Sequence, residues 1–168
     1  MIEEKGRPDY LAELYVAGVL ANAGWNVYFP HRDEGFDFVI SKYLGDGIIL
    51  RPVQVKGKYP MSEKTDKAAY GYVGKLSATH PEMVLAIPYF SSNRLHKTPI
   101  FTAYMPFRLV RPHSRGYRCQ PACFKGGQPQ PRSHYTQFFD DAGIRLVQSN
   151  AWSDMHDVAG TDDVASAE

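Results

Sequence analysis

The fold is decided by residues 35–57, which read GFDFVISKYLGDGIILRPVQVKG. Two runs of strand length, 36–40 and 48–56, are rich in β-branched and aromatic residues and are bounded by glycines, which predicts β-strands. Gly45, Asp46 and Gly47 lie between the runs and favour a turn. The stretch therefore predicts two consecutive strands.

Further elements are expected on both sides of this stretch. Upstream, Leu11, Leu14 and Gly18 recur at spacings of three and four after Pro8 and Asp9, which predicts a helix that ends by Gly24. The other segments with a usable pattern are a strand over 25–29, a helix over 63–79, and strands over 83–90 and 99–110. This order, αβββαβ, predicts an α/β protein with a central mixed sheet of about four or five strands, flanked by helices.

The composition is that of one globular domain. With 168 residues, 43% of them hydrophobic, the chain is long enough for one sizeable core and is not a disordered chain. No apolar run approaches the roughly 20 residues of a membrane span, and the N-terminus lacks the basic start and apolar centre of a secretory signal. We therefore expect a cytoplasmic protein in which Cys119 and Cys123 are reduced thiols.

Charge is distributed unevenly along the chain. Residues 151–168 hold five acids and no lysine or arginine, whereas residues 1–150 carry 19 basic and 13 acidic side chains. We expect 1–150 to form the single domain, with its core over about 9–90 and additions over 91–150, and 151–168 to be an acidic, disordered tail. No acid lies between Glu82 and Asp140, and the basic residues there are Arg94, Lys97, Arg108, Arg111, Arg115, Arg118, Lys125 and Arg132.

The basic residues between Glu82 and Asp140 have two interpretations. They could form a phosphate-binding surface, or they could be solvated charges that never converge. Many of them fall in 111–132, which is rich in Pro, Gly, Gln and Arg and predicts a long loop. In the same region Cys119, Cys123, His113 and His134 could supply four zinc ligands, although their spacing matches no strong zinc pattern.

Four polar residues of the predicted core could converge. Alternation places Gln54 and Lys56 on one face of their strand, and Asp37 on the face of the preceding strand that Phe38 does not occupy. With Glu13 from the first helix, they would supply oxygens for Mg²⁺ or Mn²⁺ and an ammonium group to offset charge on a phosphate.

Each of these residues also has a simpler interpretation. Gln54 and Lys56 could be the solvent face of an amphipathic edge strand. Asp37 could be a solvated acid near a turn, with Asp33 or Glu34 in its place, and Glu13 could be an exposed residue of the first helical turns. These alternatives stay open at the level of the sequence.

The order and spacing of several short motifs resemble the PD-(D/E)xK nuclease superfamily. The motifs are Glu13-Leu14, Gly24-Trp25-Asn26-Val27, Gly35-Phe36-Asp37-Phe38-Val39-Ile40 and Val53-Gln54-Val55-Lys56-Gly57, and the resemblance covers about residues 9–90. It is strongest to members with Gln-x-Lys in the third motif, a group that includes Holliday-junction resolvases and some restriction and homing endonucleases. Phe36 stands where the family name has proline, and Gln54 replaces the usual acid.

The resemblance implies a restriction-endonuclease-like core and a metal-dependent endonuclease that hydrolyses DNA with Mg²⁺ or Mn²⁺. It makes Asp37 the principal metal ligand, Gln54 a further ligand, Glu13 an auxiliary acid and Lys56 the catalytic lysine. Cutting both strands with one site per chain would require two encounters or a homodimer, which we expect. The residues expected to grip DNA are Lys58, Arg94, Lys97, Arg108, Arg111, Arg115 and Arg118.

Two other classes of function compete with the nuclease. One is a catalytically inactive module of the same fold that binds nucleic acid or a protein partner, because Gln54 removes one negative charge from the metal site. The other is an inhibitor that binds a basic partner through the acidic tail.

Overall fold

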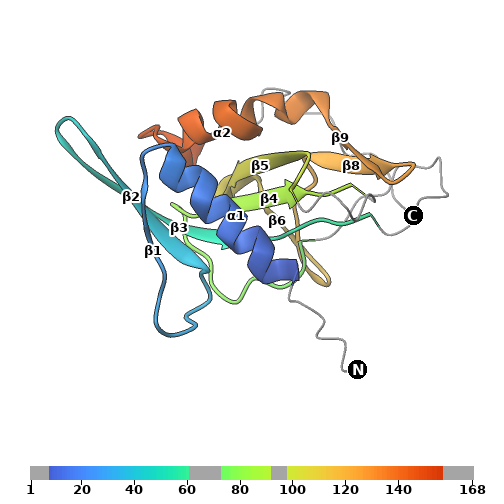
Figure 1. Ribbon diagram of the computed structural model, residues 1–168, viewed down its shortest axis with the longest axis horizontal. Helices are drawn as coiled ribbons and strands as arrows, with labels where there is room; N and C mark the ends of the chain where they lie inside the picture. Colours follow the sequence, from blue (N-terminus) through green and yellow to red (C-terminus); the bar gives the residue numbers. More distant parts are fainter. Residues whose placement is uncertain (1–7, 61–72, 92–97, 157–168) are drawn as a thin grey trace.

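The structure is a computed structural model, and it describes residues 8–60, 73–91 and 98–156. It is an α/β protein in which a five-stranded mixed sheet is accompanied by two small hairpins and few helices (Figure 1). Within the described ranges, no helix is long and apolar enough to cross a membrane.

The sheet runs in the order β1-β2-β3-β4-β5. Its strands are β1 (Asn26–Tyr28), β2 (Phe38–Leu44), β3 (Gly47–Val55), β4 (Val84–Tyr89) and β5 (Phe101–Pro106). Neighbouring strands are antiparallel except for β3 and β4, which are parallel. The five-stranded mixed sheet confirms the α/β class and the expected number of strands, although the strand expected over 99–110 is shorter and gives way to the 3₁₀ helix η1 (Phe107–Leu109).

One face of the sheet is covered by α1 (Pro8–Asn22), and the helix is held by apolar contacts. Ala12, Val16 and Leu20 recur every four residues and are fully buried against the sheet, where they meet Phe38 and Val53. Burying an aliphatic side chain of this kind contributes about 1.5–3 kcal/mol. This packing fixes the N-terminal half of α1 over the end of β3.

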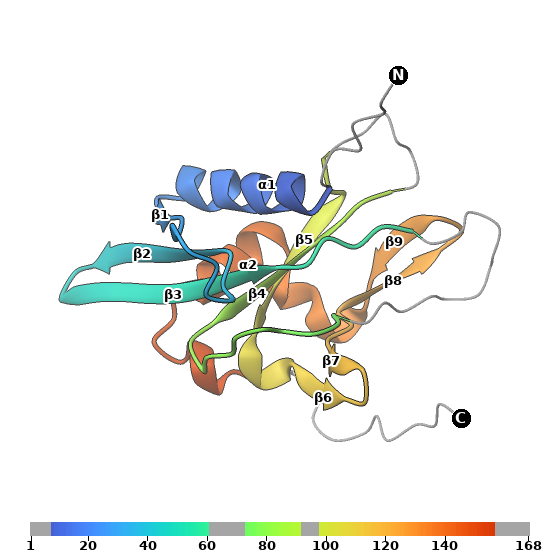
Figure 2. The same cartoon turned by 90° about the horizontal axis from the view of Figure 1, so that it is seen from below.

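The other face of the sheet carries a second apolar cluster. Leu85, Ile87 and Met105 lie there, covered by residues of the C-terminal half. That half contains two hairpins, β6 (Arg111–His113) with β7 (Gly116–Arg118) and β8 (Ala122–Lys125) with β9 (Gln128–Pro131). Figure 2 shows the β6–β7 hairpin on the side of the sheet opposite α1.

These hairpins correct the prediction of an irregular loop over 111–132. Proline and arginine hide the strand period there, but Gly126 and Gly127 adopt positive φ and allow the chain to reverse between β8 and β9. The two glycines that favour this turn were visible in the sequence. The strands that they join, however, were too short to be recognised by alternation.

The helix predicted over 63–79 is wrong for residues 73–79, and 63–72 lie outside the described residues. The backbone of Val73 and Gly74 bonds to Tyr117 instead: Val73 N–H donates to the Tyr117 carbonyl at 3.2 Å, and Tyr117 N–H donates to the Gly74 carbonyl at 2.9 Å. Pairing with β7 therefore replaces the hydrogen bonds that a helix would make.

The edge of the sheet at β5 is covered by η2 (Ser133–Phe138) and α2 (Asp140–Val147), which runs alongside β5 (Figure 1). The chain then returns to the sheet through η3 (Trp152–Asp154). The Trp152 side chain is fully buried, and its Nε1 donates to the Met83 carbonyl at 3.0 Å. The domain therefore continues beyond the expected boundary at residue 150, and 157–168 lie outside the described residues.

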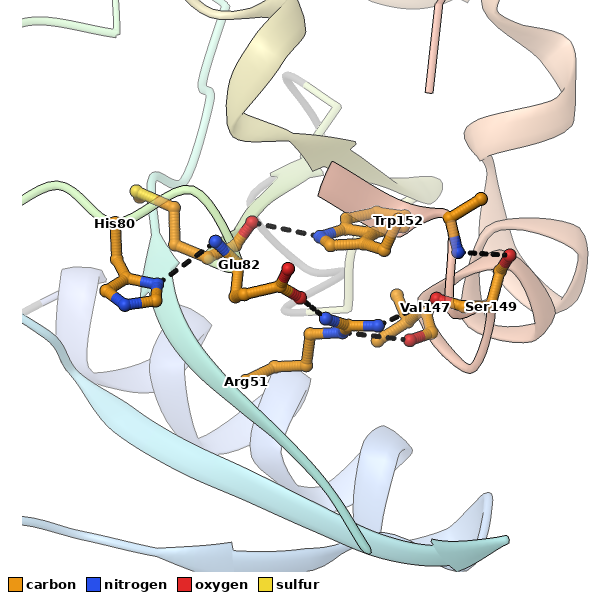
Figure 3. A network of polar contacts seen from close by, with 8 residues as sticks. Arg51, His80, Glu82, Val147, Ser149 and Trp152 are labelled. Atoms are coloured by element: carbon orange, nitrogen blue, oxygen red, sulfur yellow. Dashed lines mark hydrogen bonds and ion pairs between the residues drawn. The ribbon is translucent and has the colours of Figure 1, made fainter. Parts of the chain in front are cut away.

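A buried arginine fixes this C-terminal segment to β3. Arg51 donates from Nε to the Val147 carbonyl at 3.1 Å and from Nη2 to the Ser149 carbonyl at 2.8 Å, and its Nη1 forms an ion pair with Glu82 (Figure 3). Burial lowers the pKa of Arg51 to about 10, so the group stays charged at neutral pH. Arg51 thus satisfies carbonyl groups at the C-terminal end of α2 that the helix itself leaves without donors.

Candidate metal and phosphate site

The site is built where β2 begins and β3 ends. Phe38 is opposite Val53 in the antiparallel register, and the Asp37 N–H donates to the Val53 carbonyl at 2.9 Å. Asp37 is therefore held at the first position before β2, beside Gln54. This placement confirms that the two side chains share a face of the sheet.

The Asp37 carboxylate is fixed by two donors. Its Oδ2 accepts a hydrogen bond from the Val55 N–H at 2.6 Å and another from Gln54 Nε2 at 3.2 Å. Among the described residues, Oδ1 accepts no hydrogen bond, so this oxygen remains for a ligand. A carboxylate whose orientation is set by the backbone is suited to hold a cation in a defined place.

Gln54 is buried, and its amide has one unsatisfied atom. Nε2 is used by Asp37, whereas Oε1 has no hydrogen-bond partner in the part of the chain that the structure describes. Leaving a buried acceptor unsatisfied costs about 1–3 kcal/mol. An oxygen of this kind beside a carboxylate is a fitting ligand for a hard cation.

Glu13 lies on α1, close enough to Asp37 for the two charges to interact. Burial raises the pKa of Glu13, and the negative charge of Asp37 raises it further. Burial also raises the pKa of Asp37, against the hydrogen bond from Val55 and the positive charge of Lys56, which both lower it. Two carboxylates whose pKa values are raised by burial and proximity form a site that a cation would stabilise.

Lys56 is half-buried and completes the set. It follows Gln54 by two residues, and its backbone N–H donates to the Ala86 carbonyl at 2.9 Å, which keeps the chain extended beyond β3. Its positive charge lowers the pKa of both Glu13 and Asp37.

The close approach of α1 depends on Gly57. A Cβ at this position would lie 3.3 Å from Cβ of Ala12 and 3.1 Å from a ring carbon of Tyr59. The absence of a side chain therefore lets α1 pass over the end of β3 and present Glu13, one residue after Ala12. The sequence did not identify this role, although a glycine directly after the lysine motif was its signal.

Sequence reasoning also missed Asp9. Its charge raises the pKa of both Glu13 and Asp37, which places it near the site. Asp9 precedes Glu13 by four residues, a spacing that puts both on one side of a helix. Asp33, an alternative to Asp37 in the sequence, is exposed in the turn before β2 and accepts a hydrogen bond from the Gly35 N–H at 3.0 Å; its charge also raises the pKa of both Glu13 and Asp37.

The predicted DNA-binding residues do not form one set. Arg94 and Lys97 lie outside the described residues. Arg108 contacts Asp154 at 3.4 Å, whereas Arg111, Arg115 and Arg118 are exposed on the β6–β7 hairpin. Lys58 is mostly buried, and burial, followed by the charge of Lys56, lowers its pKa.

The described residues do not support a zinc site. Cys119 and Cys123 are free thiols, and burial raises the pKa of Cys119 to about 12, which makes it a poor metal ligand. No group of three or more His, Cys, Asp or Glu side chains gathers anywhere in the described ranges. The site at Asp37 therefore offers two carboxylates and one amide oxygen.

A pH test follows from the raised pKa of Glu13. Because the folded protein holds a proton on Glu13 more tightly than the unfolded chain does, the contribution of Glu13 to stability falls as pH rises through its folded pKa. In EDTA at pH 7 the Glu13→Gln variant should therefore melt at a higher temperature than the wild type, and the difference should vanish below about pH 4. Thermal melts across this range measure it, and a variant that melts lower at pH 7 would contradict the assignment.

Comparison with known proteins gives no family for this chain. No protein-family model, no curated protein and no solved structure matches it. The function is therefore argued from the chain's own residues.

Proposed function

We propose that this chain is a metal-dependent endonuclease that hydrolyses phosphodiester bonds in DNA. The observation that carries the proposal is the pairing of Asp37 with Gln54, which fixes a carboxylate beside a buried amide oxygen that lacks a donor. Lys56 and Glu13 lie close to this pair. Hydrolysis of a phosphodiester needs such a combination of oxygen ligands and positive charge.

The ligand set fits Mg²⁺ or Mn²⁺. Asp37, Gln54 and Glu13 would hold the ion through oxygen, and Mg²⁺ commonly binds one or two carboxylates while waters and phosphate oxygens complete its shell. With glutamine at position 54 the site carries two negative charges, so affinity should be modest without substrate. A bound ion would supply charge stabilisation at the scissile phosphate.

The chain's own residues have distinct roles in this reaction. Water adds to phosphorus, the bond to one ester oxygen breaks, and a phosphate monoester and a hydroxyl result. The Lys56 ammonium group donates to a phosphate oxygen and offsets the negative charge that builds up during attack. Glu13 would hold the ion together with Asp37 and Gln54, so the proton that the attacking water loses passes to bulk water, which also protonates the departing oxygen.

The order of elements supports a restriction-endonuclease-like core. A helix carrying Glu13 precedes three antiparallel strands, and β4 then adds in parallel to β3, the strand of Gln54. In this arrangement the acidic and amide groups come from adjacent strands, and the helix supplies the remaining acid.

The test is conversion of supercoiled plasmid to nicked and linear forms by the full chain. We expect cutting in Mg²⁺ or Mn²⁺ and none in EDTA, and the ratio of linear to nicked product bears on the expected homodimer. The Asp37→Asn protein, purified in the same way, controls for contaminating nucleases and should leave the plasmid intact.

A folded protein that cuts neither plasmid, branched nor single-stranded DNA in either metal would overturn the proposal. In that case Gln54 would mark a site that has lost catalysis, and the chain would be a binding module of the same fold.

A further inference from the structure

The β6–β7 hairpin concentrates positive charge. Arg111 and Arg118 are directly opposite each other in the antiparallel pairing, Arg115 lies in the turn between the strands, and all three are exposed. Side chains opposite each other across a strand pair are about 5 Å apart at Cβ, and like charges there are destabilising.

Among the described residues, no ion pair offsets these charges. The sequence has no Asp or Glu from 83 to 139, and none of the ion pairs formed by described residues includes Arg111, Arg115 or Arg118. The fold thus tolerates repulsion between these arginines, as is expected of a surface that binds a polyanion.

The hairpin is anchored along the outer edge of β7. Tyr117 exchanges backbone hydrogen bonds with Val73 and Gly74, and its ring lies 6.2 Å from that of Phe107. Gly116 has φ +122°, and a Cβ there would be 2.4 Å from the Gly74 carbonyl oxygen. The arginines are therefore carried by an anchored element and not by a loose loop.

The residue that follows the hairpin lies close to the chain that follows β3, the strand of Gln54. Cys119, directly after β7, is buried near Lys58, whose charge lowers the pKa of the thiol against the larger effect of burial. Lys58 follows Lys56 by two residues and is close to it. It forms a parallel β-bridge with Tyr89 of β4. Positive groups thus extend from the site toward the hairpin.

We propose that the β6–β7 hairpin is a second phosphate-binding site, separate from the metal site, that grips the backbone of a nucleic acid away from the scissile phosphate. The choice of nucleic acid as the polyanion rests on the proposed function. Arg111, Arg115 and Arg118 contact phosphates through their guanidinium groups, independently of base sequence.

The experiment measures binding without cleavage. Fluorescence anisotropy of a labelled DNA duplex in EDTA gives the dissociation constant over a range of salt concentrations. The triple variant Arg111→Gln, Arg115→Gln, Arg118→Gln should bind roughly 10- to 100-fold more weakly, and the slope of log affinity against log salt should fall by about 2–3. Arg145→Gln, at an exposed arginine of α2, controls for the loss of a surface arginine outside the hairpin and should bind as the wild type does.

Stability separates binding from a structural role. Because the triple variant removes facing like charges, its melting temperature should equal or exceed that of the wild type. An unchanged affinity and salt slope in the triple variant would overturn the proposal, as would equal competition by poly-glutamate at the same charge concentration.

The binding test is independent of catalysis. Hairpin-dependent DNA binding by a protein that cuts nothing would leave this site standing and remove the nuclease. Metal-dependent cutting by a protein whose DNA binding does not depend on the hairpin arginines would support the nuclease and remove the hairpin site.

Discussion

Replacing Lys56 with alanine should lower the rate of plasmid cleavage by about 10²- to 10⁴-fold while metal binding is retained. The reason is that the ammonium group acts on the phosphate and on the charge that develops there, whereas Asp37, Gln54 and Glu13 supply the metal ligands. Removing one positive charge near the carboxylates should, if anything, favour a cation at the site.

Two measurements separate the roles of Lys56 and Asp37. Single-turnover cleavage gives the rate, and the electron paramagnetic resonance signal of free Mn²⁺ gives metal affinity. Lys56→Ala should lose the rate and keep the affinity, whereas Asp37→Asn should lose both. Lys125→Ala, an exposed lysine at the end of β8, is the control and should cut normally. A Lys56→Ala protein that cuts at the wild-type rate would remove this residue from the mechanism.

Replacing Arg51 with methionine should destabilise the protein by about 3–5 kcal/mol. Methionine keeps much of the length of the side chain but leaves the Val147 and Ser149 carbonyls without their donor and Glu82 without its cation. For a chain of this size the loss corresponds to a fall in melting temperature of roughly 10 °C.

Thermal unfolding followed by circular dichroism measures this loss, with Arg145→Met as the control on the exposed face of α2. Tryptophan fluorescence supplies a second readout, because Trp152 lies beside the Arg51 network (Figure 3). We expect its emission to shift to longer wavelength in the variant as the segment after α2 loosens. A fall of less than about 2 °C would show that Arg51 does not hold this segment.

The sequence was sufficient for the sheet and for the central part of the site. Alternation in 36–40 and 48–56 placed Asp37 and Gln54 on one face, and the hydrogen bond between them confirms it. The period of a strand is local, so a reader of the sequence can assign faces without knowing the rest of the fold. The roles of these residues in catalysis stay predictions.

What the sequence could not show depends on contacts between distant residues. Val73 belongs to a run of apolar residues at helical spacing. The backbone of Val73 and Gly74 nevertheless bonds to Tyr117, which comes 43 residues after Gly74. Trp152 lies in a segment with the composition of a tail, yet it is buried against Met83. In both cases tertiary pairing overrides a local pattern.

The charge pattern of the sequence did not show which basic residues have an acidic partner. Arg108 and Arg118 belong to one acid-free stretch, but Arg108 meets Asp154, which comes from the acidic C-terminal stretch. The hairpin register that places Arg111 against Arg118 becomes visible only when both strands are paired.

The bond between Asp37 and the Val55 N–H makes the alignment of the proposed site depend on the β2–β3 turn, although Gly45 and Asp46 lie far along the hairpin from either residue. If a residue inserted into one arm of a hairpin shifts the register by one position, every later side chain of that strand turns to the opposite face of the sheet. A one-residue insertion in this turn would then exchange Gln54 and Lys56 for Val53 and Val55 at the cation site, whereas a two-residue insertion would preserve the face. Length variation at the tip of this hairpin is thus constrained by parity, and a library of turn lengths should alternate between inactive and active proteins.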